Sequence, residues 1–429
     1  MFKKSLIVSV LLFCFVLKIN ASMILLPMDL EQRNHLKAYG ITYWVLSLDV
    51  EAWWLLNYRG GSFAFPHSLV FEKECKTRGV SYEVIPDGAF SRILDEINQP
   101  EVNMDVMKLE KAPKIAVYTP TEGFKSSKGE QIQPWDDAVT LVLTYAEIPF
   151  DKVYDDEVLA DKLIEYDWLH LHHEDFTGQY GKFYSGYHTQ PWYKENQRLA
   201  EAIAHKHGFN KVSQLKLAVV KKIKEYVIGG GFMFAMCSAT DTYDIALAAD
   251  GVDIVDKYYD GDPPDPNAQN KLNFSKTFAF ENFELVKNPL EYEHSTIDNH
   301  YGRKVDPEQD YFSLFDFSAK WDPVPTMLTQ CHTRTVKGFM GQTTAFRKSV
   351  VKSNILVLGE NKAADEVRYI HSPVGQGFFT FYGGHDPEDY RHYVHDPDTD
   401  LNLHPQSPGY RLILNNVLFP AAKKKKRKT

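Results

Sequence analysis

The sequence predicts an α/β protein with a doubly wound, flavodoxin-like and mostly parallel sheet. From residue 114 onward, short apolar runs that suit buried strands alternate with long helical patterns. Glycine turns come directly before two of these runs, at 232–236 and 378–382. Hydrophobic residues make up 44% of the 429-residue chain and charged residues 24%, so the chain has enough apolar material for a large core.

The pattern divides the chain into a leader, an N-terminal α/β unit, a main α/β domain and a basic tail, at residues 1–22, 23–112, 113–421 and 422–429. In the N-terminal unit, helices and strands are expected to alternate, with helices at 30–39 and 90–97 and strands at 43–48 and 81–85. In the main domain, the segment at about 251–325 is aromatic, acidic and weakly periodic. We expect an inserted subdomain there, placed to form a lid over the site.

The leader is typical of an exported protein. Lys3 and Lys4 precede an apolar stretch that ends at Leu17, and Ala21 offers a small residue for cleavage. The stretch is too short to span a membrane as a helix, so we expect the protein in the periplasm or the cell envelope. A formal net charge of −9 argues against a nucleic-acid partner. The basic tail could contact an anionic envelope surface or act only as a solubilising end.

Cys237 lies where the predicted strand 232–236 turns into a helix capped near Ser238. Ala235 lies two residues before Cys237 and Ala239 two residues after it. The crowded backbone of a nucleophile elbow requires small side chains at these positions. A helix N-terminus also stabilises a thiolate. Two interpretations stay open: Cys237 is a catalytic nucleophile, or it is a small buried thiol, which is the usual state of a free cysteine.

Three cysteines follow the leader: Cys75, Cys237 and Cys331. An odd number in an exported chain leaves at least one free thiol. A disulfide between Cys75 and Cys331 would leave Cys237 free, but the sequence is equally compatible with three buried thiols.

A catalytic cysteine needs a base that takes its proton and a third group that orients the base. His385 is the candidate base, because it follows the predicted strand 378–382 on a glycine-flanked loop. Glu388 or Asp386 could orient its ring. A late histidine is also often a hydrogen-bonded structural residue, so both roles stay open for His385.

Substrate contacts are expected at one edge of the sheet, because the carboxyl ends of strands in a wound sheet lie together. The backbone N–H of Ser238 is one candidate oxyanion donor, and N–H groups near Gly178 are the other. The segment that leads to Gly178 begins with Glu174, a further candidate contact.

The alternative to cysteine chemistry is a metal site. His170 and His172 are two residues apart on a predicted strand and so share a face, and His392 lies beyond His385. Neutral imidazoles with nearby carboxylates suit zinc. The chain has no compact ligand motif, however, so we expect no metal and no other cofactor.

Two stretches resemble the class I glutamine amidotransferase-like superfamily, and its trehalose-utilisation (ThuA-like) branch in particular. They are residues 226–237, which end at Cys237, and residues 377–387, which contain His385. The resemblance covers about 114–420 and implies a flavodoxin-like sheet. It also implies a Cys–His–Glu triad that hydrolyses an amide, which would fall on Cys237, His385 and Glu388.

The chain departs from that family in two respects. Amidotransferases have glycine where this chain has Ala235 and Ala239. They also place the histidine and glutamate two residues apart, whereas His385 and Glu388 are three apart. ThuA-like proteins often lack the cysteine, so the resemblance supports the predicted fold more strongly than the predicted catalysis.

The whole chain also resembles exported bacterial proteins labelled asparagine synthetase B. Its residues do not support that activity. No nucleophilic cysteine follows the leader, and the chain has no Ser-Gly-Gly-x-Asp-Ser loop to hold the pyrophosphate of ATP.

These observations predict an exported, amidotransferase-like hydrolase or transferase that acts on an amide or acyl group with Cys237 as nucleophile. The alternative is a non-catalytic protein of the cell envelope that binds a glycan or a partner in the same pocket. Aromatic residues make up 14% of the chain, which suits glycan binding and also suits a well-packed core. In either case the expected ligand is a small molecule or a glycan.

Overall fold

The computed structural model describes residues 22–120, 136–299, 303–322, 327, 331–394 and 396–422, and every structural statement below refers to these residues. Almost all of the predicted leader and of the basic tail lies outside them, and Ser22 is the first residue of a strand. In these ranges, no helix combines the length and the apolar composition that crossing a bilayer requires.

The N-terminal unit is an antiparallel five-stranded sheet in the order β4-β1-β3-β2-β5. Its strands are β1 (Ser22–Leu26), β2 (Ala52–Leu56), β3 (Ser62–Pro66), β4 (Glu83–Pro86) and β5 (Asp105–Leu109). Helices α1 (His35–Ser47) and α2 (Leu69–Arg78) pack on one face, and α3 (Asp87–Ile97) packs on the other. The expected α/β composition is present, and the sheet is entirely antiparallel.

The strand expected at 43–48 is wrong, because residues 43–47 belong to α1. The side chain of Asn34 caps this helix by accepting the N–H of Lys37 at 2.9 Å. Helix α1 lies between the two sheets of the molecule, and ten of its residues are buried. A helix that is buried nearly all round shows no one-sided apolar pattern, so its periodicity could not be recognised in the sequence.

The main domain contains a ten-stranded sheet in the order β11-β10-β13-β14-β15-β9-β8-β6-β7, with β12 paired to β14. Its strands are β6 (Ile115–Tyr118), β7 (Asp151–Val153), β8 (Trp168–Leu171), β9 (Phe232–Met236), β10 (Tyr311–Leu314), β11 (Thr335–Lys337), β12 (Phe346–Arg347), β13 (Leu356–Asn361), β14 (Glu366–Val374) and β15 (Gly377–Tyr382). Strands β15, β9, β8, β6 and β7 are parallel, and the others are antiparallel. The predicted parallel sheet is therefore confirmed for half of the strands, and the whole is a mixed, parallel-rich sheet.

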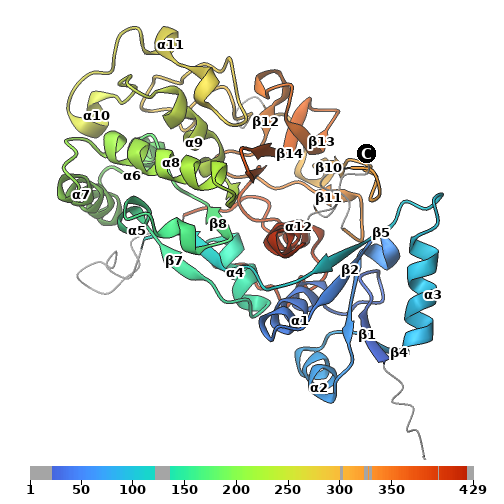
Figure 1. The fold of residues 1–429 in the computed structure, drawn as a ribbon. Helices are drawn as coiled ribbons and strands as arrows, with labels where there is room; N and C mark the ends of the chain where they lie inside the picture. Colours follow the sequence, from blue (N-terminus) through green and yellow to red (C-terminus); the bar gives the residue numbers. More distant parts are fainter. Residues whose placement is uncertain are drawn as a thin grey trace, which may run out of the picture.

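Both faces of the parallel strands are covered by helices. Along β9, Phe232, Phe234 and Met236 join the core beneath α1, α4 (Ala138–Tyr145) and α12 (Pro408–Leu418). Met233 and Ala235 point to the opposite core, which contains α5 (Asp155–Leu159), α7 (Pro191–Lys206), α8 (Val212–Ile228) and α9 (Ser238–Ala248). This alternation explains why the sequence of β9 is apolar throughout. Figure 1 shows α12 in the centre of the molecule, between the two sheets.

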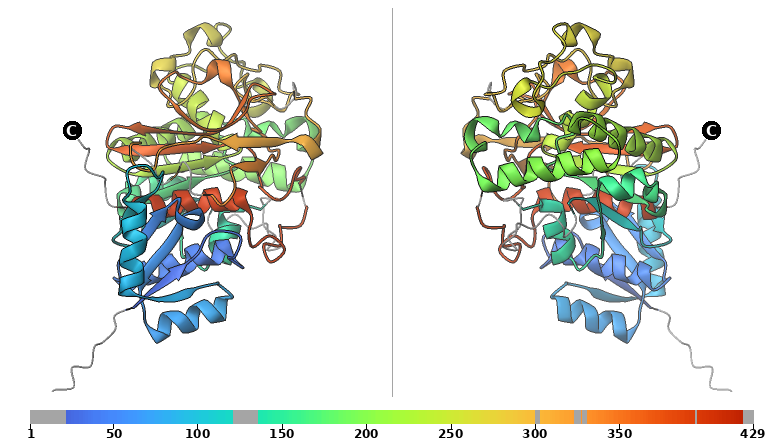
Figure 2. Two further views of the ribbon diagram at one scale, coloured as in Figure 1. Left: turned by 90° about the vertical axis from the view of Figure 1, so that its right-hand side faces the viewer. Right: turned by 90° about the vertical axis from the view of Figure 1, so that its left-hand side faces the viewer.

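The segment 251–299 contains two short α-helices, α10 (Lys257–Asp260) and α11 (Ala268–Lys271), and a 3-10 helix at Phe274–Lys276, joined by loops. One further short helix, α6 (Tyr184–Tyr187), precedes α7. Figure 2 shows that this segment (yellow) lies on the opposite side of the main sheet from the N-terminal unit (blue). Strand β10 falls within the predicted insertion and joins the main sheet.

Candidate functional site

Three neighbouring parallel strands end at the same edge of the main sheet. In the register, Leu171 of β8 pairs with Ala235 of β9, and Met236 of β9 pairs with Tyr382 of β15. The residues that follow these strands include His172, Cys237 and His385. The structure therefore brings together the strand ends from which the sequence predicted the chemistry.

Cys237 occupies the sharp corner between β9 and α9. Its backbone has φ 51° and ψ −139°, which is unusual for a residue with a side chain. Such a conformation costs about 1–3 kcal/mol and persists only where the surrounding structure enforces it. The local geometry is that of the predicted elbow.

Backbone N–H groups surround the sulfur of Cys237. The N–H of Gln342 donates to Sγ at 3.3 Å, and the N–H groups of Thr343 and Ser238 also favour the thiolate. Burial outweighs them, since only 1% of the residue is exposed, and raises the pKa of the Cys237 thiol to about 11. The thiol is therefore neutral in this conformation at neutral pH.

Residues of the inserted segment and of the 341–344 loop cover the elbow. The side-chain amide of Gln342 donates to the carbonyl of Tyr292 at 3.2 Å and to that of Gly181 at 2.6 Å. The hydroxyl of Thr343 donates to Asp241 in the first turn of α9 at 2.9 Å. These contacts hold the loop that reaches the sulfur against α9, Gly181 and one residue of the inserted segment, and the lid stays a prediction.

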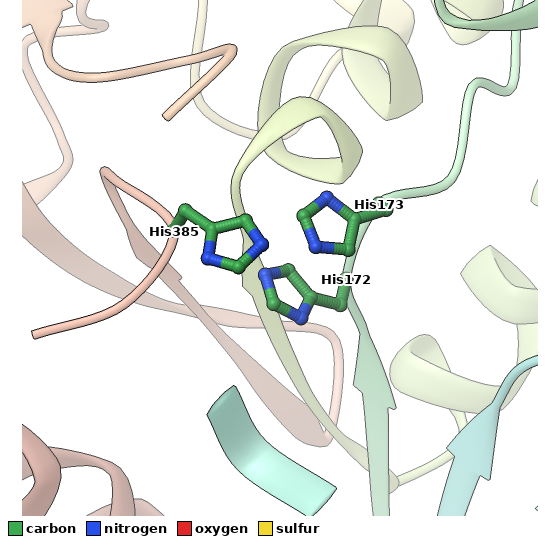
Figure 3. A group of neighbouring side chains, drawn as sticks. All are labelled: His172, His173 and His385. Carbon is green, nitrogen blue, oxygen red and sulfur yellow. The ribbon is translucent and has the colours of Figure 1, made fainter. Parts of the chain in front are cut away.

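The ring of His385 lies among other histidines. Its centroid is 4.3 Å from that of His173, 5.0 Å from that of His172 and 4.6 Å from that of His392. Its Nε2 is 3.8 Å from a carboxylate oxygen of Asp136, a residue that the sequence analysis did not single out. Figure 3 shows the rings of His172, His173 and His385 pointing toward one another.

The two carboxylates predicted to orient His385 have other contacts. The carboxylate of Glu388 forms an ion pair with His404, with 3.1 Å between Oε2 and Nδ1. The carboxylate of Asp386 is buried and accepts the backbone N–H of Glu388 at 2.8 Å. The carboxylate that the structure places beside the His385 ring is that of Asp136.

The predicted substrate contacts lie in two places. Gly178 packs against α8, where a Cβ would lie 2.7 Å from the backbone nitrogen of Ser213, and its φ is +81°. Glu174 is buried with an oxygen 3.6 Å from Nζ of Lys216, and burial raises the pKa of Glu174 to about 7. Of the two predicted oxyanion donors, Ser238 is the one whose backbone N–H lies beside the sulfur of Cys237 and favours its thiolate.

The three histidines of the metal alternative divide between two aspartates. Asp137 Oδ2 is 3.0 Å from His170 Nε2 and 2.8 Å from His172 Nδ1, and Asp137 also caps α4. His392 Nε2 is 3.2 Å from an oxygen of Asp136. The structure adds His173 and Asp136 to this group. The sequence signal for His173 was its position next to His172.

A cleft of about 560 Å³ opens beside the histidines. It is lined mainly by hydroxyl, amide, carboxylate and imidazole groups, among them those of Tyr118, Thr140, His172, His173, Asp398 and Asn402. Polar walls of this kind suit a hydrophilic ligand. Cys237 is not part of the lining.

No family model matches this chain, and no curated protein matches it. Among solved structures, the chain is similar to the cytoplasmic protein STM3548 from Salmonella typhimurium, with 11% identity and a TM-score of 0.34 over 72% of this chain and 100% of that one. It is similar to the cytoplasmic protein STM1381 from Salmonella typhimurium LT2, with 13% identity and a TM-score of 0.31 over the same shares. A third match is Gan42B, a GH42 beta-galactosidase from G. stearothermophilus, with 12% identity and a TM-score of 0.28 over 64% of this chain and 28% of that one. TM-scores of 0.34 and below carry no argument about activity, which rests on the site itself.

Proposed function

We propose that this chain is a hydrolase or acyl transferase with Cys237 as its nucleophile. The observation that supports the proposal is the backbone conformation of Cys237 at the corner of β9 and α9, combined with the N–H groups of Ser238, Gln342 and Thr343 around its sulfur. Strained residues of this kind cluster at active sites. Backbone N–H groups beside a nucleophile can stabilise the oxyanion that forms when it attacks a carbonyl.

Catalysis would require the cover over Cys237 to open. A thiol whose pKa is about 11 is ionised to roughly one part in ten thousand at pH 7. Opening of the segment around Tyr292 and Gln342 would admit water and substrate, and the lost burial would bring the pKa of the thiol down. This arrangement suits an enzyme that exposes its nucleophile only when a substrate displaces the lid.

His385 is the proposed base of the metal-free protein. Its backbone N–H donates to the carbonyl of Met340 at 2.9 Å, and the N–H of Gly384 donates to the carbonyl of Thr343 at 2.8 Å. The loop that carries His385 is therefore joined to the loop that contacts the sulfur. Asp136 is the carboxylate beside the ring, so we propose it, rather than Glu388, as the group that orients His385.

Thiol labelling tests this proposal with two internal controls. Cys75 and Cys331 are also buried free thiols with raised pKa values. We expect an amide-like electrophile at pH 7 to modify Cys237 faster than both, measured by peptide mass spectrometry. We also expect Cys237→Ala to abolish turnover of carboxamide and ester substrates. Cys75→Ala should turn over the same substrates at the rate of the wild type. Equal labelling of the three thiols, or turnover by Cys237→Ala, would reject the nucleophile.

The second candidate is a binding protein for a glycan, favoured by the polar cleft that excludes Cys237. Its test is titration calorimetry with soluble oligosaccharides. Binding that is unchanged by Cys237→Ala, together with an inert thiol, would favour this function over catalysis.

We also propose that the protein is exported and acts in the periplasm or at the cell envelope. The leader supports this, and β1 begins at Ser22, so cleavage after Ala21 would leave the N-terminal sheet complete. N-terminal sequencing of the protein from a fractionated cell tests the proposal, since an intact Met1 in the cytoplasmic fraction would contradict it.

A further inference from the structure

Three imidazoles converge at the edge of the cleft. Nitrogen atoms of His172, His173 and His385 lie within 4.8 Å of one another, and Asp136 forms an overlapping group of the same size with His385 and His392. His172 and His173 follow β8, and His385 follows β15, so two separate strands position the group (Figure 3). Both His172 and His173 line the cleft, and solvent therefore has a route to them.

Several polar atoms of this group have no hydrogen-bond partner among the described residues. They are Nε2 of His172, both ring nitrogens of His385 and Oδ2 of Asp136. His172 and His385 are only 2% and 5% exposed. Leaving a buried polar atom unpaired costs about 1–3 kcal/mol, so a native structure normally supplies a partner. Three side chains with unpaired atoms in one place indicate a missing ligand rather than an isolated packing defect.

The donor atoms of the group suit a cation. They are imidazole nitrogens and the carboxylate oxygens of Asp136. Imidazole lone pairs and carboxylate oxygens are donors that a transition-metal ion binds.

A second carboxylate fixes the orientation of one ring. Asp137 Oδ2 lies 2.8 Å from Nδ1 of His172, which leaves Nε2 of that ring directed away from the carboxylate. A histidine held by a carboxylate at its other nitrogen is the usual arrangement of a metal ligand. Asp137 is itself fixed, because its other oxygen caps α4 by accepting the N–H of Thr140 at 2.7 Å.

We propose that His172, His173 and His385 bind one divalent transition-metal ion of the zinc type, with Asp136 as the fourth ligand. Zn–N bonds of about 2.0–2.1 Å require the ring nitrogens to approach more closely than the 4.8 Å within which they lie here, so the proposal includes a rotation of these side chains when the metal binds. The donor set of imidazoles and a carboxylate favours zinc over calcium or magnesium.

The metal site does not depend on catalysis by Cys237, and the two proposals make different demands on His385. When a ring nitrogen of His385 donates its lone pair to a metal ion, that nitrogen cannot accept the proton of a thiol. Metal binding would therefore slow any reaction that uses His385 as base. A metal ion at the edge of the cleft could instead polarise a ligand or a water molecule bound there.

Metal loading of tag-free protein tests this proposal. The full chain is treated with a chelator, dialysed, and titrated with Zn²⁺; bound metal is measured by mass spectrometry and thermal stability by circular dichroism. We expect one zinc ion per chain and a higher melting temperature, because a ligand that binds only the folded state stabilises it. We expect His172→Gln and His385→Gln to lose both effects.

His188→Gln is the matched control, because it removes an exposed histidine directly after α6 and should bind zinc as the wild type does. Asp137→Asn keeps a capping side chain on α4 and removes the charge shared by His170 and His172, so we expect about 10–100-fold weaker zinc binding. Cys237→Ala should bind zinc normally, which separates this proposal from the nucleophile. A wild-type chain that binds no zinc, or unchanged zinc affinity in His172→Gln and His385→Gln, would overturn the site.

Discussion

At the scale of single residues, Cys237 shows how one position combines local strain with burial. Its positive φ follows from the corner between β9 and α9, and its thiol is covered by a loop distant in the sequence. The elbow could be predicted from Ala235 and Ala239 on either side. The high pKa of the thiol could not, because it depends on what covers the sulfur.

The first prediction concerns the pH dependence of labelling at Cys237. The reactive species is the thiolate, and the pKa of about 11 lies above the unperturbed value. The labelling rate of the native protein should therefore rise roughly tenfold per pH unit from pH 7 to about pH 10. Stopped-time alkylation followed by mass spectrometry measures this slope. A rate that levels off near neutral pH would show that the thiol is already activated at rest.

The second prediction concerns Gly341, next to the loop of His385. A Cβ on Gly341 would lie 2.7 Å from the backbone nitrogen of His385 and 2.8 Å from the carbonyl carbon of Gly384. Because backbone atoms must move to make room, Gly341→Ala should lower the free energy of unfolding by about 1–3 kcal/mol. Urea denaturation measures the change. Gly88→Ala is the control, since that glycine lies in α3 with open space around it and should gain up to about 1 kcal/mol.

At the scale of elements, the sequence was most informative where a strand or helix has a regular environment. The apolar runs of β9 and β15 were recognised with nearly their true bounds. The second half of α1 was assigned to a strand because the helix is buried nearly all round. The antiparallel half of the main sheet was not predicted, since an apolar strand pattern does not reveal the direction of its neighbour.

The third prediction concerns a buried aspartate directly before β10 that pairs with two arginines, one of them in β14. Asp310 lies 2.5 Å from Arg303 and 3.0 Å from Arg368, and all three side chains are at most 3% exposed. Removing the carboxylate leaves two buried cations less well compensated, so Asp310→Asn should cost about 3–5 kcal/mol in the free energy of unfolding.

The exposed pair Arg334–Asp316, at 2.9 Å, supplies the control for Asp310. Asp316→Asn should change stability by no more than about 1 kcal/mol, because water screens surface pairs. Equal effects of the two substitutions in urea denaturation would show that the buried cluster contributes no more than a surface contact.

At the scale of the whole molecule, α12 joins the two sheets. Arg411 of α12 donates to the hydroxyl of Tyr39 in α1 at 3.0 Å and to the carbonyl of Met28 at 3.0 Å. The ring of His332 from the main domain stacks on that of His35, with 4.2 Å between centroids. These contacts should make the N-terminal unit and the main domain unfold together.

The fourth prediction concerns acid stability at this junction. Burial, and after it the charge of Arg411, lowers the pKa of His35 to about 3 and that of His332 to about 4. Because both pKa values lie below the unfolded value of about 6.5, protonation favours the unfolded chain. Stability from these residues should be complete above about pH 6.5 and be lost as the pH falls toward 4, by up to ~1.4 kcal/mol per pH unit for each group.

Urea denaturation of the wild type and of His35→Gln between pH 7 and pH 5 measures this loss. We expect the wild type to lose more stability over this range than His35→Gln, which has one titrating group fewer at the junction. His205→Gln, which removes an exposed histidine on α7, should follow the wild type. If the free energy of unfolding falls equally with pH in the wild type and in His35→Gln, the lowered pKa of His35 is contradicted.

The sequence by itself determined the local features of this protein: the buried parallel strands, the elbow at Cys237 and the delivery of His385 by a glycine-flanked loop. These follow from residue size, periodicity and backbone freedom within a few neighbouring positions. Only the tertiary structure decided which side chains meet. It placed Asp136 beside His385, put Glu388 next to His404 and gathered the histidines at the cleft. Contacts between segments distant in the sequence depend on how loops and helices pack, and a single sequence does not encode that packing in any local pattern.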